Sequence, residues 1–217
     1  MRRIGLLACL AVVLAACGNM LNPEGRTATP SPSPLPSGVA NINNSGDETL
    51  PPGRYTRHDF APRVTFDLEG PWYGRQVLVG FFDVQQGAQN DPHVIAVQFA
   101  RPSALFGADG EREPADAAEA ATILATNPEL QVVETSTSQV GGLDGTQITV
   151  ENTGAAPAEI MRLPPGVIGI NPERRLWIAF FDTDEGLLAI MVGGSIERWD
   201  EALATAEPVL ESIEIEQ

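Results

Sequence analysis

The side chains best suited to chemistry in this chain are its two histidines, His58 and His93, and the carboxylates beside them. His58 precedes Asp59, and His93 follows Asp91 by two residues. Imidazole and carboxylate groups can together bind zinc, which activates water for hydrolysis. Neither histidine has a second ligand three or four residues away, the spacing that prepares a metal site on a helix. We therefore expect two surface histidines and keep a small metal-assisted hydrolase using His58 and His93 as an alternative.

Other catalytic patterns are weaker still. The chain has no lysine and no Gly-x-Ser-x-Gly sequence, so the usual phosphate-binding loop and the usual nucleophilic serine turn are both excluded. Asp182–Gly186 lacks the remaining acidic positions of a calcium-binding loop and is typical of a hairpin turn. We expect no catalytic residue, no metal ligand and no cofactor.

The N-terminus has the parts of an export signal. Arg2 and Arg3 are followed by an apolar run, Ile4 to Ala16, which is shorter than the ~20 residues of a membrane-spanning helix. Leu14-Ala15-Ala16-Cys17 then resembles the lipobox of bacterial lipoproteins. The resemblance implies cleavage before Cys17, attachment of diacylglycerol to its sulfur, and an extracytoplasmic protein held to the cell membrane by fatty acyl chains. An ordinary secretory cleavage site with a cysteine by chance is the alternative.

The charge balance excludes one class of partner. Cleavage after Ala16 would leave 201 residues with 11 Arg, no Lys and 29 Asp or Glu, a formal charge of −18. A surface this acidic repels nucleic-acid phosphates and anionic lipid headgroups. We expect no nucleic-acid partner and contact with the membrane only through the anchor. With Cys9 removed and Cys17 acylated, no thiol would remain for a disulfide or a metal.

Composition divides the remaining chain into a tether and one folded domain. Residues 17–49 are rich in Pro, Ser, Gly, Thr and Asn and contain Thr29-Pro30-Ser31-Pro32-Ser33-Pro34-Leu35-Pro36. Such a segment buries too little apolar surface to offset the entropy of ordering. We predict a signal peptide over 1–16, a disordered lipidated tether over 17–49 and a globular domain over 50–217.

Apolar patterning from Leu50 onward predicts mainly strands. The run 76–84 is apolar on both faces and predicts one central strand, which pairs with 94–100. Two further hairpins are expected around Gly141–Gly145 and Asp184-Glu185-Gly186, which supply turn residues. Residues 153–172, rich in Pro and Gly, are expected to form a loop.

Two segments have the spacing of helices. Residues 115–126 place small apolar side chains on one face, with Asp116 and Glu119 as a capping pair. Residues 196–211 form the second helix, with Ser195 expected as its N-cap and a bend at Pro208. Together the elements predict the α+β class: a single domain with a central, mainly antiparallel β-sheet of about seven strands and helices at roughly 115–126 and 196–211 packed on it.

The order of these pieces resembles PsbP-like domains and related small bacterial lipoproteins. The similarity is carried by Phe60–Phe66 followed by Trp72, by the hairpin Ile178 to Met191, and by the end from Trp199 to Ile213. It implies an antiparallel sheet flanked by helices and a role as an accessory or binding module of a larger assembly.

The expected function follows from anchor and resemblance together. We predict a membrane-anchored extracytoplasmic lipoprotein that acts as a non-catalytic binding module of the cell envelope, with a protein partner there. A solute-binding component of a transporter is a further alternative. Trp72-Tyr73 is expected to anchor a loop onto the core, with an aromatic binding lip as the other interpretation.

Overall fold

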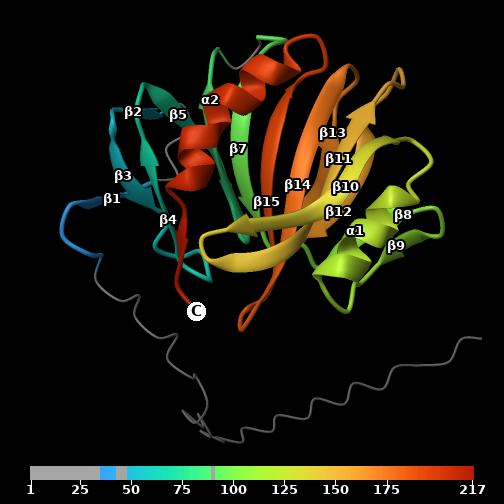
Figure 1. Cartoon of the computed structure of the whole chain (residues 1–217), viewed down its shortest axis with the longest axis horizontal. Coiled ribbons are helices and arrows are strands. Elements are labelled where there is room, and N and C mark those ends of the chain that lie inside the picture. Colours follow the sequence, from blue (N-terminus) through green and yellow to red (C-terminus); the bar gives the residue numbers. More distant parts are fainter. Residues whose placement is uncertain (1–34, 43–47, 89–90) are drawn as a thin grey trace, which may run out of the picture. The chain divides into compact units, whose positions relative to one another are not determined.

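A computed structural model describes residues 35–42, 48–88 and 91–217 (Figure 1). The chain divides into two units, Met1–Ser31 and Pro32–Gln217, and all described residues belong to the second. The predicted signal peptide and Cys17 therefore lie outside the described residues.

The largest sheet has eight strands, and each neighbouring pair in it is antiparallel. Their spatial order is β10-β11-β14-β15-β7-β6-β5-β2. In chain order they are β2 (Glu48–Leu50), β5 (Trp72–Leu78), β6 (Phe81–Gln86), β7 (Ile95–Ala100), β10 (Gln131–Val140), β11 (Leu143–Asn152), β14 (Arg174–Thr183) and β15 (Gly186–Ser195).

Two four-stranded sheets accompany it. One has the order β1-β3-β4-β16 and contains a parallel pair, β1 with β3. The other has the order β13-β12-β8-β9. The strands are β1 (Val39–Asn41), β3 (Gly53–Thr56), β4 (Val64–Leu68), β16 (Glu214–Ile215), and β8 (Ala104–Gly107), β9 (Gly110–Arg112), β12 (Ala158–Leu163) and β13 (Gly166–Ile170).

The predicted fold class was wrong. The described chain is mostly β, with sixteen strands in three sheets and two helices, and not a single seven-stranded sheet flanked by helices. The segment 153–172, expected to be a loop, contains β12 and β13, which pair with each other and with β8. Its Pro and Gly residues lie largely between and beside these short strands. The Pro- and Gly-rich composition therefore indicated a loop where two strands are present. Strand β1 and the first two residues of β2 precede Leu50, so the strands begin earlier in the chain than composition indicates.

The apolar run 76–84 is a hairpin and not one strand. Strands β5 and β6 pair antiparallel around Val79 and Gly80. Gly80 has φ of +72°, a conformation that side chains other than glycine rarely adopt. The pairing predicted between this run and 94–100 is confirmed for its second half, because β6 pairs with β7. The hairpins β10–β11 and β14–β15 are confirmed as well.

The two helices differ in how they begin. Helix α1 (Ala117–Ala125) starts after Asp116, whose Oδ1 accepts a hydrogen bond of 2.7 Å from the Glu119 amide, so the predicted cap is confirmed. Helix α2 (Trp199–Glu211) starts after Arg198, which offers no side-chain cap. Ser195 is the last residue of β15, so its predicted role as N-cap was wrong.

Each face of the large sheet packs against a separate core. On the first face, helix α2 and strands β3 and β4 cover a stack of aromatic rings. The ring centroids of Phe82 and Phe99 in this stack are 4.6 Å apart. On the second face, α1 and the β8–β12 sheet cover Ile148, Ile178 and Phe180. Because successive residues of a strand point to opposite faces, the run 176–181 supplies both cores.

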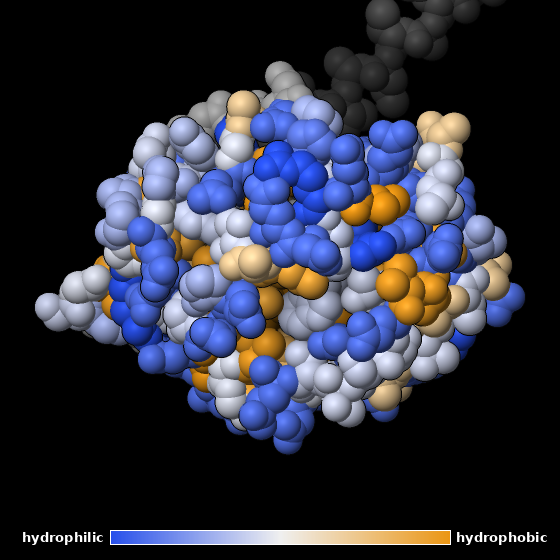
Figure 2. All heavy atoms as spheres, turned by 45° about the horizontal axis from the view of Figure 1, so that its top comes forward, coloured by the Kyte–Doolittle hydropathy of each residue, from blue (hydrophilic) through white to orange (hydrophobic). Residues whose placement is uncertain are grey.

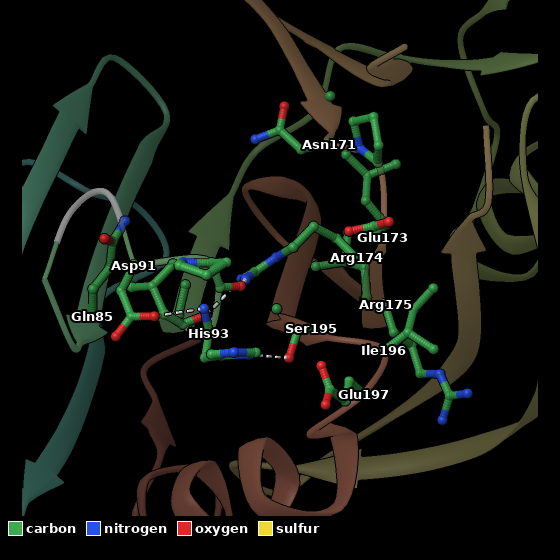
Figure 3. A pocket seen from close by; sticks show the side chains of 18 of the residues that line it. Gln85, Asp91, His93, Asn171, Glu173, Arg174, Arg175, Ser195, Ile196 and Glu197 are labelled. Atoms are coloured by element: carbon green, nitrogen blue, oxygen red, sulfur yellow. Dashed lines mark hydrogen bonds between the residues drawn. The ribbon is translucent and has the colours of Figure 1, made fainter. Parts of the chain in front are cut away.

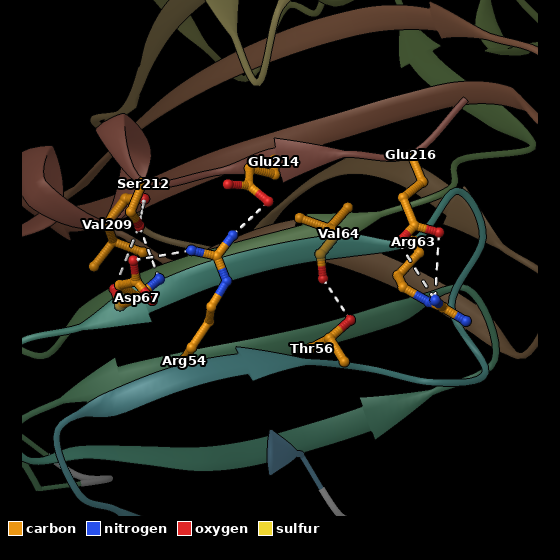
Figure 4. Close-up of polar contacts among 9 residues, drawn as sticks. All are labelled: Arg54, Thr56, Arg63, Val64, Asp67, Val209, Ser212, Glu214 and Glu216. Carbon is orange, nitrogen blue, oxygen red and sulfur yellow. Dashed lines mark hydrogen bonds and ion pairs between the residues drawn. The ribbon is translucent and has the colours of Figure 1, made fainter. Parts of the chain in front are cut away.

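Polar contacts fasten the C-terminus to the small β1-β3-β4-β16 sheet (Figure 4). Arg54 of β3 pairs with Asp67 and with Glu214 of β16. The Asp67 amide donates to Ser212 Oγ at 2.8 Å, and Arg63 pairs with Glu216. These contacts hold the end of the chain against β4.

Candidate functional site

A cleft of about 820 Å³ opens on the second face of the large sheet. One row of residues from four neighbouring strands lines it: Gln85 pairs with Ala96, Ala96 with Gly193, and Gly193 with Leu176. Directly opposed residues of an antiparallel sheet share a face, so this row forms a continuous lining. The end of β13, the loops before β7 and β14, and the residues after β15 complete the walls.

Three polar side chains converge at one end of the row (Figure 3). Ser195 Oγ lies 3.0 Å from His93 Nδ1, and Ser195 is only 8 % exposed. Arg174 is paired with Ser195 across β14 and β15. Its Nη1 donates to the Pro92 carbonyl at 2.7 Å and its Nη2 to the Val94 carbonyl at 2.6 Å. Arg174 thus fixes the loop that carries His93.

Arg174 is a cation that the fold has partly removed from water. Burial lowers the pKa of the Arg174 guanidinium, while the charge of Asp91 acts in the opposite direction. Within the described chain, no carboxylate lies within ion-pairing distance of Arg174. Its neighbour Arg175, by contrast, forms an ion pair with Glu151 and lies over the Trp199 ring. Among the described residues, Arg174 thus forms no ion pair of the kind that Arg175 forms, although the charge of Asp91 acts on it from farther away.

Three carboxylates stand around this cation. Asp91, Glu173 and Glu197 line the cleft from both walls (Figure 3). Glu173 has φ of +60°, the single positive value among the described residues other than glycine. Two main-chain hydrogen bonds hold it there, from its amide to the Asn152 carbonyl and from the Ile196 amide to its own carbonyl. The residues that line the cleft thus include three carboxylates and two guanidinium groups, those of the half-buried Arg174 and Arg175.

The buried side chain of Asn152 supports this wall. Its Nδ2 donates to the Ala156 and Ile170 carbonyls at 2.8 and 2.7 Å, and its Oδ1 accepts from the Gly154 amide. An amide that makes three such bonds fixes the loops on either side of it. The cleft wall that carries Glu173 is therefore built from side-chain contacts as well as from sheet pairing.

The two histidines do not share a site. His58 Nδ1 donates to Asn41 Oδ1 at 2.9 Å, and the His58 amide donates to the same oxygen. His58 lies outside the residues that line the cleft, and Asp59 pairs with the buried Arg57. In the described part of the chain, no three His, Cys, Asp or Glu side chains are placed to hold a metal ion. The geometry thus gives no support to the two-histidine hydrolase.

Among the described residues, the contacts of His93 differ from those of a catalytic serine–histidine–acid triad. Asp91 Oδ1 accepts from the His93 amide at 2.8 Å, so this carboxylate orients the main chain and not the imidazole ring. The catalytic arrangement of serine, histidine and acid requires the acid on the ring nitrogen opposite the serine. Here Ser195 Oγ contacts His93 Nδ1, while Asp91 contacts the His93 amide.

Sequence reasoning missed most of this site. His93 and Asp91 were singled out, but for a metal, and Ser195 was assigned to a helix cap. Arg174, Glu173 and Glu197 belong to none of the sequence motifs considered. One feature of the sequence could have pointed to this site. The charged residues Glu173 and Arg174 stand just before the apolar run that begins at Leu176, where the chain leaves the core.

The aromatic pair Trp72-Tyr73 lies away from the cleft lining. Trp72 is buried in the first core at 3 % exposure, as expected, but it begins strand β5 and does not lie in a loop; Arg75 lies over the Tyr73 ring. The face shown in Figure 2 is mainly hydrophilic, with hydrophobic residues in small separate patches.

None of the helices described is long and apolar enough to cross a bilayer.

Comparisons with known proteins give structural similarity only. No family model matches the chain, and no curated protein matches it. The solution structure of a cyanobacterial PsbP (CyanoP) from Synechocystis sp. PCC 6803 is similar with a TM-score of 0.43 and 14 % identity, over 81 % of this chain and 97 % of that one. A 1.50 Å crystal structure from Bacteroides thetaiotaomicron VPI-5482 has a TM-score of 0.35 and 13 % identity, over 71 % of this chain and 45 % of that one.

Proposed function

We propose that this chain is a lipid-anchored, extracytoplasmic binding module of the cell envelope, without catalytic activity, and that its ligand occupies the cleft beside His93 and Ser195. The proposal of an anchor rests on Arg2, Arg3 and the sequence Leu14 to Cys17, which resembles a lipobox. The proposal of binding rests on the cleft.

The observation that carries the binding role is the polar end of the cleft. Pockets that hold ligands combine a shaped apolar lining with a few placed polar groups. Here Ala96, Gly193 and Leu176 supply the apolar row, while Ser195, His93 and Arg174 supply the polar groups. A volume of about 820 Å³ is within the range of ~300–1,000 Å³ that small ligands and peptide segments occupy.

The charged residues of the cleft indicate which chemical groups a ligand would carry. A positively charged group would be attracted to the three carboxylates of the walls, and a carbonyl or carboxylate oxygen would meet Arg174, His93 and Ser195. A partner in the cell envelope that inserts a basic side chain of an extended segment satisfies both requirements. A purely anionic ligand is disfavoured by the surrounding negative charge.

The ligand site is tested by blocking the cleft. The variant Gln98→Trp places an indole on the cleft lining, while Glu207→Trp places the same group on the exposed side of α2. Native mass spectrometry of the full chain extracted from its own membranes is expected to show a bound species in the wild type and in Glu207→Trp but not in Gln98→Trp. The same bound species in all three proteins, or none in any, would reject the cleft as the ligand site.

The anchor is tested separately. Mass spectrometry of the mature N-terminus should find diacylglycerol on Cys17. Cys17→Ala should move the protein out of the membrane fraction. A wild-type protein that is secreted without acyl chains, or that stays in the cytosol, would contradict the proposal of a lipoprotein.

A further inference from the structure

The outermost strand of the large sheet, β10, is exposed along almost its whole length. Seven of its ten residues are exposed, two are half-buried, and only Val140 is buried. In the described part of the chain, β11 is its one strand neighbour. An edge strand of this kind offers a row of main-chain donors and acceptors to another strand.

The other sheet edges are short. Strands β1, β2 and β9 have three residues each, β16 has two and β13 has five, whereas β10 has ten. Natural proteins protect edges by keeping them short or by placing lysine or proline on them. Strand β10 has neither residue type, and its one irregularity is a bulge between Val132 and Glu134.

The sequence of β10 is complementary to itself in the antiparallel direction. Glu134-Thr135-Ser136-Thr137-Ser138 reads nearly the same from both ends. A two-fold axis at Ser136 would place Thr135 opposite Thr137, and Glu134 opposite Ser138. Opposed threonines stabilise a strand pair, and no carboxylate would face another carboxylate. The only charge on the strand is Glu134.

We propose that two copies of this chain associate along β10, antiparallel and about a two-fold axis near Ser136, so that their eight-stranded sheets become continuous. A second copy is the occupant that this edge favours, because it alone is certain to supply a strand of equal length with the matching pattern of Thr and Ser. The arrangement is isologous, and it closes as a dimer because the other edge of the same sheet has only three residues.

Electrostatics gives this association a distinctive salt dependence. Each chain carries a formal charge of −16, so two copies repel each other at long range. The proposed contact contains no ion pair that salt could weaken. Dimerisation is therefore expected to strengthen as ionic strength rises, until the repulsion is screened.

Cysteine crosslinking in the intact, full-length protein in its membrane tests the contact. With a thiol crosslinker of short reach, Ser136→Cys should give a covalent dimer, as should Thr135→Cys mixed with Thr137→Cys. The matched control is Glu207→Cys, an exposed position on α2, and the unsubstituted protein reports any reaction of its own cysteines. A dimer yield from Ser136→Cys no higher than from Glu207→Cys would overturn the proposal, as would capture of a different protein in place of a second copy.

A second variant separates pairing from chance collision. Adding Thr135→Lys and Thr137→Lys to Ser136→Cys would bring four ammonium groups together at the two-fold axis, and the crosslinked dimer should fall at least tenfold. Thr122→Lys, on the exposed face of α1, should leave the yield unchanged. Circular dichroism melting of each variant verifies that it is folded. An equal yield from the folded lysine variant would exclude pairing along β10.

Discussion

Ser195 and His93, 102 residues apart in the sequence, meet through a contact of 3.0 Å between Oγ and Nδ1. The contact links the end of β15 to the loop that leads into β7, at the edge of the cleft. It brings together a residue that looked like a helix cap and a residue that looked like a metal ligand. Both line the cleft.

Removing the hydroxyl tests this contact. Ser195→Ala should lower the free energy of unfolding by about 1 kcal/mol, because the half-buried imidazole loses its partner. Chemical denaturation measures the change. Ser103→Ala is the matched control, since the exposed Ser103 Oγ makes a longer contact of 3.3 Å to the Arg162 carbonyl. Equal effects of the two substitutions would show that the contact between Ser195 and His93 contributes nothing.

Arg174 should hold the loop before β7 in place. Arg174→Met keeps an unbranched apolar stem but removes the guanidinium group and with it both hydrogen bonds to the Pro92 and Val94 carbonyls. Amide hydrogen exchange over residues 91–94 is expected to become about tenfold faster, the factor that corresponds to 1.4 kcal/mol of local stability. Arg101→Met removes one contact to a carbonyl at an exposed site and should leave this segment unchanged. Unaltered exchange in Arg174→Met would refute the bracing role.

The ion pair of Arg57 and Asp59 should make stability depend on pH. Burial would raise the pKa of Asp59, but the hydrogen bond and charge of Arg57 outweigh it, so the pKa lies below its ordinary value of 3.8. A carboxyl with a lower pKa in the folded state stabilises the fold fully above its unfolded pKa, and this stabilisation is lost as pH falls through the folded pKa.

Asp59→Asn should accordingly cost about 1 kcal/mol at neutral pH, with a smaller difference from wild type below pH 3.8. Denaturation at several pH values measures this. In an Arg57→Met background this loss of stability toward low pH should be smaller, because only His58 and a main-chain hydrogen bond then oppose the effect of burial on the pKa of Asp59. A constant difference between wild type and Asp59→Asn across the whole range would contradict the assigned cause.

The first core depends on close approach of α2 to β15. A Cβ atom on Gly194 would lie 2.6 Å from the Ala202 Cβ, so Gly194→Ala should force the helix outward and cost about 1–3 kcal/mol. Gly166→Ala, at a position with open space around it, serves as the control for the glycine substitution itself. Thermal unfolding of the two variants should differ clearly. Equal melting temperatures would show that α2 adjusts without strain.

Local features of this fold could be read from the sequence. The cap at Asp116 is set by neighbouring residues, as is the turn at Asp184-Glu185-Gly186. The number and grouping of strands could not, because short strands such as β8 and β12 are stabilised by pairing with distant segments. The cleft depends on the register of four strands from β6 to β15, which no local pattern contains.

Photo-crosslinking in living cells tests the central claim most directly. A photoreactive residue in place of Gln98, on the cleft lining, is compared with the same residue in place of Glu207, on the exposed side of α2. A binding module that uses this cleft should give a discrete crosslinked species from position 98 and only background from position 207. Background from position 98, or the same products from both positions, would contradict a ligand in the cleft.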